Sequence, residues 1–270
     1  MSSGGAGQWL GRSLGSRTVS WNERDAMLFA LAVGARPDQL DLVFERDLRV
    51  LPTFGLTLAQ WAPDALGAAG AFDVGQALHG SQTLRVRSAL PPSGELTLDA
   101  RVTAVWDKGR AAIFDVTVDS DLFSATWSIF APGQGGFGGD RGPRAAPPAA
   151  TQPDEHVAVR LALNAALLYR LSGDRHHIHV DPAAAQAIGQ PRPILHGLAT
   201  LATAALALAD LTGVHPCDLT ELQGRFSSAV YPGETVDVSS WRGGGFRVDS
   251  TRGVAIDSGT AIFERSSIGL

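Results

Sequence analysis

The segment from Ile194 to Leu211 constrains the fold most, because it is apolar around nearly its whole circumference. Alanines and leucines fill it, and few polar residues interrupt them. A helix that lacks a polar face is buried on every side. The segment therefore predicts a helix wrapped by a sheet. His196, Thr200, Thr203 and Asp210 break the apolar run, which argues against a membrane span.

The stretch just before this helix concentrates the polar chemistry of the chain. Residues 172–174 are Ser-Gly-Asp, which favours a turn, and residues 181–182 are Asp-Pro, typical of a helix N-cap followed by proline. A short helix is expected over 183–188. Asp174 and His179 then lie on one loop, where they can face each other across a small gap.

Gly197 falls in the first turn of the predicted long helix. Backbone N–H groups at that position lack partners within the helix, and the helix dipole favours negative charge there. A glycine lets a ligand oxygen approach the amide closely. Taken singly, each residue has a simpler interpretation: Gly197 could serve helix packing, Asp174 could be a turn residue and His179 a core histidine.

The first half of the chain predicts a helix or two and then an antiparallel meander. Residues 21–35 have helical periodicity, with Ser20 as the N-cap and Glu23 as its capping-box partner. Residues 64–75 are expected to form a loop. The strands expected in this half cover 47–50, 52–58, 81–87, 95–106, 111–120 and 122–130.

The second half repeats this outline, with a helix followed by strands at 219–229, 235–242, 245–251 and 253–263. Two units of roughly 120 residues, each a helix with a curled antiparallel sheet, are the economical interpretation. We therefore expect an α+β fold with an N-terminal unit over 1–132, a Gly/Pro/Ala-rich linker over 133–155 and a C-terminal catalytic unit over 156–270.

Composition excludes several classes of function. The net charge is −5 and Lys108 is the only lysine, which argues against a nucleic-acid surface. Cys217 is the only cysteine, so neither an intrachain disulfide nor a cysteine-based zinc cluster can form. Residues 1–5 carry neither the basic nor the hydrophobic region of a secretion signal, so the cytoplasm is the expected location.

Motifs in both halves point to one family. They are Asp174 to His179, Pro193 to Gly197 and Arg225 to Thr235 in the second half, and Leu78-His79-Gly80, Asp107-Lys108-Gly109 and Gly135 to Gly139 in the first. In these motifs the chain resembles the MaoC-like, hydratase 2 group of R-specific enoyl-CoA hydratases. That resemblance implies a double hotdog, in which two curled antiparallel sheets are each wrapped around a helix, and it implies a homodimer.

The resemblance also implies roles for particular residues. Asp174 and His179 match the family's catalytic pair, and Gly197 matches the glycine whose amide holds the thioester oxygen. The family pattern Ser-Gly-Asp-x-Asn-Pro-Leu-His has asparagine and proline where this chain has His176 and His177, so His176 would place a titratable ring beside the catalytic water. The residues implied to line the site for coenzyme A and the acyl group are His79, Gly80, Lys108 and Phe226.

Hydration of a conjugated thioester requires water to attack Cβ, a proton to reach Cα and the thioester oxygen to carry negative charge. Asp174 and His179 can share the water, and such positioned proton transfer contributes ~10²–10⁴-fold. The Gly197 amide can stabilise the enolate oxygen by roughly 3 kcal/mol. We therefore expect a hydro-lyase that converts 2-enoyl-CoA to (3R)-3-hydroxyacyl-CoA with neither a metal nor a redox cofactor.

Several alternatives stay open. The chain could be a dehydratase for carrier-protein-bound or branched thioesters, or a thioester-binding protein that has lost catalysis, since His176 and His177 depart from the family pattern. Asp174, His176 and His179 also offer the oxygen and nitrogen donors that zinc or iron accepts, although no residue is marked as a further ligand. Spacing does not decide which member of the catalytic pair is the base.

Overall fold

The structure is a computed structural model that describes residues 5–144 and 152–264. The strands are β1 (Ser13–Trp21), β2 (Leu78–Val86), β3 (Gly94–Asp107), β4 (Ala111–Asp119), β5 (Phe123–Pro132), β6 (Glu155–Arg160), β7 (Leu219–Phe226), β8 (Thr235–Trp241), β9 (Gly245–Ser250) and β10 (Gly253–Phe263). The α-helices are α1 (Glu23–Ala32), α2 (Leu40–Val43), α3 (Phe54–Ala59), α4 (Trp61–Ala68), α5 (Ala165–Tyr169), α6 (Pro182–Ala187) and α7 (Gly197–Thr212). Short 3-10 helices are η1 (Ala6–Trp9), η2 (Arg170–Ser172), η3 (His177–His179) and η4 (Pro216–Asp218).

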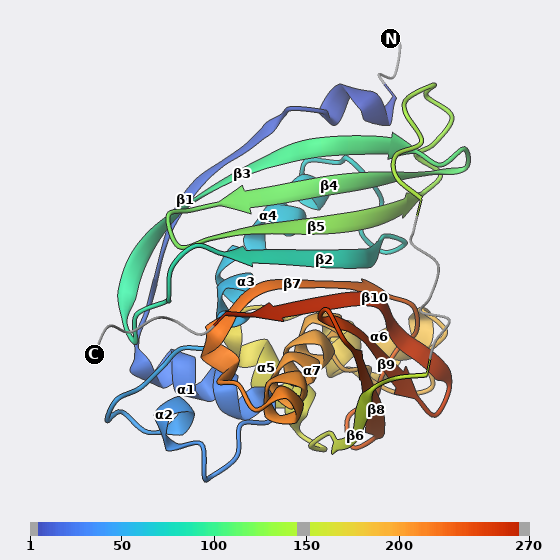
Figure 1. Cartoon of the computed structure of the whole chain (residues 1–270). Coiled ribbons are helices and arrows are strands. Elements are labelled where there is room, and N and C mark those ends of the chain that lie inside the picture. Colours follow the sequence, from blue (N-terminus) through green and yellow to red (C-terminus); the bar gives the residue numbers. More distant parts are fainter. Residues whose placement is uncertain (1–4, 145–151, 265–270) are drawn as a thin grey trace.

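Ten strands form one antiparallel sheet in the order β1-β3-β4-β5-β2-β7-β10-β9-β8-β6. The first five belong to the N-terminal half and the last five to the C-terminal half, and the two halves join where β2 pairs with β7 (Figure 1). The predicted α+β architecture of two curled halves is confirmed. The two halves share a single sheet.

The central helix of the C-terminal half is α7, and the prediction that a sheet wraps it is confirmed. Every residue from Leu198 to Ala209 is buried, and the helix contacts β6, β7, β8 and β10. Gly213 ends it in the left-handed conformation, at φ 65°. Because one face of each surrounding strand packs onto this helix, its N-terminus is fixed relative to the sheet.

The central helices of the N-terminal half are α3 and α4, where the sequence predicted a strand over 52–58 and a loop over 64–75. The strand prediction was wrong, and the loop prediction was wrong over 64–68, which belong to α4, whereas residues 69–75 are irregular as predicted. The short apolar run from Phe54 is buried on all sides, and periodicity does not separate a buried helix from a buried strand over such a length. α3 contacts β5, and α4 contacts β1 and β4, so this pair takes the place that α7 holds in the other half.

The first helix begins later than predicted. α1 is capped by Asn22, whose side chain accepts from the Asp25 N–H while the Asp25 carboxylate accepts from the Asn22 N–H. The expected N-cap, Ser20, lies instead in strand β1, and α1 packs on α2 and α5 rather than inside the sheet. The strand predicted over 47–50 is an irregular segment.

Two strands were not predicted from the sequence, and both lie at the edges of the sheet. β1 is exposed on both faces along most of its length, so its residues do not alternate between apolar and polar. β6 begins at Glu155, at the end of the predicted linker. Residues 145–151 of that linker lie outside the described residues. In the described parts of the chain, no helix is long and apolar enough to cross a membrane.

Candidate active site

The loop between α5 and α6 carries the polar stretch seen in the sequence. Asp174 is half-buried, and its Oδ1 accepts from the His176 N–H at 3.1 Å. As predicted, Asp181 caps α6 by accepting from the Ala183 N–H at 2.9 Å. Gly173 has a φ of 148°, and a Cβ placed there would lie 3.1 Å from the Thr57 carbonyl of α3. The loop of the C-terminal half therefore packs directly against the central helices of the N-terminal half.

His179 is oriented by a backbone carbonyl. The side chain is 7% exposed, and its Nδ1 lies 2.9 Å from the Ile194 oxygen. Because a carbonyl oxygen only accepts, Nδ1 carries the proton and Nε2 keeps a free lone pair. His179 therefore presents a proton acceptor to its surroundings.

A second histidine, His196, stacks on His179 with ring centroids 3.6 Å apart and an interplanar angle of 24°. Its Nε2 donates to the Asp174 backbone oxygen at 3.1 Å, and its Nδ1 is buried without a partner among the described residues. The Tyr169 ring packs 4.7 Å from His196. In the sequence His196 stood out only as a polar residue in the apolar run, and its place in this cluster was not predicted.

Burial keeps both rings neutral. Desolvation lowers the pKa of His179 below its usual value of 6.5, although the nearby Asp174 charge opposes that change. Desolvation, followed by the neighbouring His179, lowers the pKa of His196 to about 3. Near neutral pH the centre therefore contains an aspartate and two uncharged imidazoles.

Gly197 is the first residue of α7, where its amide has no partner within the helix. A Cβ placed on Gly197 would lie 3.1 Å from the Phe226 ring, so a larger residue would have to displace that ring. The His79 ring of β2 packs 4.7 Å from Phe226 and is held by a hydrogen bond to the Ser81 oxygen at 3.1 Å. Burial lowers the pKa of His79 to about 4. The predicted residues His79, Phe226 and Gly197 are therefore brought together.

Gly80 and Lys108 contact residues outside the group formed by His79, Phe226 and Gly197. A Cβ on Gly80 would lie 3.2 Å from the Ser128 oxygen, so the close approach of β2 and β5 accounts for this glycine. Lys108 lies in the turn between β3 and β4, and its Nζ donates to the Arg141 carbonyl. Its contact with coenzyme A stays a prediction.

The N-terminal half adds one carboxyl group that the sequence did not suggest. Asp64 lies in the first turn of α4. Burial, and then the negative charge of Asp174, raise the pKa of Asp64, while Gln60 and His176 lower it. Asp64 was not predicted to belong to the site, because its segment was expected to be a loop.

The donor set does not fit a shared metal ion. Ligand atoms of Asp174, His179 and His196 lie within 4.8 Å of one another, so His196 rather than His176 completes the set. A metal binds in the plane of an imidazole, at about 2.0–2.1 Å for zinc. Two rings stacked 3.6 Å apart at 24° have planes that meet well beyond that distance. Both histidines therefore cannot direct a lone pair at one ion.

Comparisons with known proteins cover nearly the entire chain. Residues 19–131 match the family model of the MFE-2 hydratase 2 N-terminal domain, and residues 144–261 match the MaoC like domain. The chain is 38% identical to enoyl-CoA hydratase ChsH3 of Mycobacterium tuberculosis, over 87% of this chain and 88% of that protein. It is also 38% identical to 3-hydroxyacyl-thioester dehydratase Y of the same organism, over 82% of each chain.

Solved structures share the fold. A MaoC-like dehydratase from Phytophthora capsici aligns with a TM-score of 0.83 at 24% identity, over 95% of this chain and 97% of that one. A Mycobacterium tuberculosis protein described as a double hotdog aligns with a TM-score of 0.60 at 15% identity, over 94% and 96%. Together with the matches in sequence, these findings establish that the chain belongs to the MaoC-like, hydratase 2 family.

Proposed function

We propose that this protein is an R-specific 2-enoyl-CoA hydratase, a hydro-lyase that adds water reversibly to trans-2-enoyl-CoA and forms (3R)-3-hydroxyacyl-CoA. One observation carries the proposal: ligand atoms of Asp174 and His179 lie within 4.8 Å of each other and of His196, the residue that directly precedes Gly197 at the start of the buried helix. Relatives named for hydratase and dehydratase activity support it.

The two acceptors can hold one water molecule. The Asp174 carboxylate and His179 Nε2 each accept one of its O–H groups, which aims the oxygen at Cβ. As the new C–O bond forms, one acceptor takes a proton from the water. The pair then delivers that proton to Cα, so both groups regain their starting state. Which group carries the proton is left open, because the two are coupled.

The start of α7 supplies the electrostatic part of the reaction. Negative charge develops on the thioester oxygen as water attacks, and the Gly197 amide at the positive end of the helix can donate to it. The rings of Phe226 and His79 pack together beside the Gly197 amide. By excluding water they strengthen the interaction between this amide and the thioester oxygen. No metal or redox cofactor enters these steps, and metal analysis of the purified protein tests that point.

The proposed substrate is an acyl-CoA thioester. We assign its thioester region to Gly197, Phe226 and His79, and we propose that Lys108 meets the coenzyme A moiety. A test of the overall function is the loss of the ultraviolet absorbance of crotonyl-CoA and longer enoyl-CoA esters, followed by chiral analysis of the product. Formation of the (3S) product, or no reaction with any chain length, would contradict the proposal.

A second candidate function is the reverse reaction, dehydration of a 3-hydroxyacyl thioester that is bound to a carrier protein instead of coenzyme A. The relative named 3-hydroxyacyl-thioester dehydratase favours it, because dehydration uses the same groups in the opposite direction. Comparing kcat/KM for the CoA ester and the matching carrier-protein ester separates the two. A preference for the carrier-protein ester would favour the dehydratase.

We further propose a cytoplasmic homodimer. Light scattering of the purified protein measures its mass in solution, and a monomer would contradict the dimer. A fluorescent fusion of the chain tests its location in cells.

A further inference from the structure

Two of the three groups that we assign to the reaction, the His179 ring and the Gly197 amide, depend on one short segment, residues 194–197. The Ile194 carbonyl accepts from His179 Nδ1 at 2.9 Å, and Gly197 carries the amide at the start of α7. The Ile194 N–H donates in turn to the Ile178 carbonyl at 3.2 Å. A shift of this segment would therefore move the His179 ring and the Gly197 amide together.

The turn between β7 and β8 holds this segment from the side. The Leu195 N–H donates to the Val230 carbonyl at 2.7 Å. The next residue, Tyr231, donates its hydroxyl to Gln190 Oε1 at 2.6 Å. The turn thus binds the chain both before and within residues 194–197.

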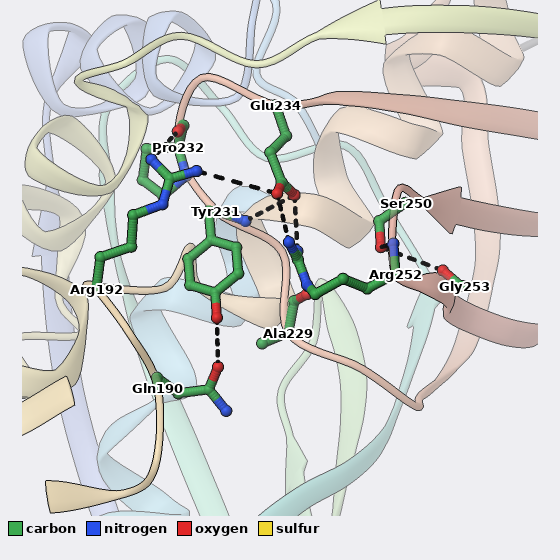
Figure 2. A network of polar contacts seen from close by, with 9 residues as sticks. All are labelled: Gln190, Arg192, Ala229, Tyr231, Pro232, Glu234, Ser250, Arg252 and Gly253. Carbon is green, nitrogen blue, oxygen red and sulfur yellow. Dashed lines mark hydrogen bonds and ion pairs between the residues drawn. The ribbon is translucent and has the colours of Figure 1, made fainter. Parts of the chain in front are cut away.

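The carboxylate of Glu234 is the centre of this turn (Figure 2). Arg252 donates to its two oxygens at 2.6 and 2.8 Å, and the Tyr231 N–H donates to Oε2 at 3.2 Å. Arg192 adds a contact of 4.0 Å. The Glu234 side chain is 11% exposed, so these charged bonds form largely away from water, and those from Arg252 hold the pKa of Glu234 below its usual range.

The Tyr231 ring is fixed by the same two arginines. Figure 2 shows it between the guanidinium groups, with Cζ of Arg252 4.1 Å and Cζ of Arg192 4.8 Å from its centroid. Arg252 also donates to the Ala229 carbonyl at 2.9 Å. The backbone on both sides of Val230 is therefore tied to the Glu234–Arg252 pair.

We propose that Glu234 is a positioning residue for the hydration reaction. With Arg252 and Tyr231 it fixes residues 194–197, and through them it sets where the His179 ring and the Gly197 amide face the substrate. The inference rests on the proposed function. Glu234 itself does not touch the substrate in this proposal and acts only through Arg252, Tyr231 and residues 194–197.

The first variant is Glu234→Gln, which is nearly isosteric. It removes the charge and turns one acceptor oxygen into an NH₂ group that faces an arginine donor. We expect kcat to fall about 10-fold or more, because displacement of a reacting group by about 1 Å can cost ~10²-fold. KM should change by less than about 3-fold, since the binding surface is kept. Tyr231→Phe, which loses only the bond to Gln190, should lower kcat in the same direction by less.

A matched control lies beyond the other end of α7. Asp218 accepts from Arg49 at 2.7 Å, and their side chains are 12% and 36% exposed, close to the 11% and 39% of Glu234 and Arg252. Asp218→Asn therefore removes a comparable ion pair without touching residues 194–197. It should leave kcat within about 2-fold of the original protein, because the effects of distant sites are independent.

The second measurement is the titration of the His179 ring by NMR. Burial keeps its pKa below 6.5. In Glu234→Gln that pKa should move toward 6.5 as the segment loosens, whereas Asp218→Asn should leave it unchanged. Equal kcat and equal His179 titration in the two variants would overturn the proposal. If Glu234→Gln does not fold, an unchanged kcat in Tyr231→Phe overturns it. A wild-type protein without hydratase activity would instead refute the proposed function, and the His179 titration would still test the positioning.

Discussion

The stacked rings of His179 and His196 determine how the centre can be protonated. Each ring donates one N–H to a backbone carbonyl, His179 to Ile194 and His196 to Asp174. A second proton on either ring would place a charge 3.6 Å from its neighbour in a buried site. The reactive form therefore has two neutral imidazoles beside the Asp174 carboxylate.

This arrangement predicts the acid limb of the pH–rate profile. The proposed role of His179 needs a free Nε2, and burial lowers the pKa of this ring below 6.5. A base with a lowered pKa stays neutral as pH falls through 6.5, so kcat/KM should hold its value there and decrease only at lower pH. The check is kcat/KM for crotonyl-CoA between pH 8 and 4. An acid limb centred at or above pH 6.5 would contradict it.

Gly197→Ala tests the close approach at the helix start. The added methyl would lie 3.1 Å from the Phe226 ring and would have to displace this wall of the proposed thioester site. We expect kcat to fall about 10²-fold, comparable to loss of an oxyanion donor. The melting temperature should change little, because alanine favours the helix and offsets crowding of the ring. Near-normal kcat would show that the Gly197 amide does not bind the thioester oxygen.

Spacing and residue type were enough to predict that Asp174 and His179 lie together, because turn and cap residues bound their loop, whereas Gly197 was joined to them by the family resemblance. They did not reveal His196 or Asp64. His196 joins the cluster through stacking, which leaves no pattern in the sequence. Asp64 lies on α4 in the other half of the chain, and its electrostatic interaction with Asp174 arises from tertiary packing that leaves no pattern in the sequence.

The stability of the C-terminal half depends on α7, since the sheet of that half is wrapped around it. Leu201 is fully buried in it, at 0% exposed. Leu201→Ala should lower the free energy of unfolding by about 2–5 kcal/mol, through lost burial and the cavity left behind. Leu163→Ala is the control, because that side chain is 77% exposed. It should change the free energy of unfolding by less than about 0.5 kcal/mol. Urea unfolding measures both, and equal losses would contradict this account of α7.

Predicting helices and strands worked where one face of an element is buried. Strands β3, β4 and β5 alternate between buried and more exposed residues, and α7 is buried from Leu198 to Ala209. Prediction failed at β1 and β6, which are sheet edges, and at α3, whose short apolar run suits a strand equally well. The helix there is imposed by packing across β5 rather than by local preference.

Across the complete chain, the two halves are joined by more than their shared sheet. Thr203 of α7 donates to the Val33 carbonyl at 2.8 Å, and His215 lies 2.8 Å from the Asp41 carboxylate. Arg36 and Asp210 form a further ion pair. These contacts link the region around α1 and α2 to the middle and the C-terminal end of α7. We therefore expect the halves to unfold together.

Global stability should depend on pH through the buried histidines. The pKa values of His196 and His79 are lowered to about 3 and about 4, so each takes up a proton on unfolding once pH falls below 6.5. The unfolded chain then binds more protons, and the free energy of unfolding decreases as pH drops from 6.5 toward 4. The limit for one such group is about 1.4 kcal/mol per pH unit. Urea unfolding at pH 7.5 and pH 5 measures this decrease, and equal stability at both would refute it.

The most direct test of the catalytic claim is the kcat of three variants with crotonyl-CoA: Asp174→Asn, His179→Ala and the double variant. Because both side chains are proposed to act on one water molecule, each single change should lower kcat about 10²-fold or more, and the double variant should lose little beyond the worse single one. Calorimetry should show that each variant still binds the thioester. Near wild-type turnover by the double variant would contradict the assignment of Asp174 and His179.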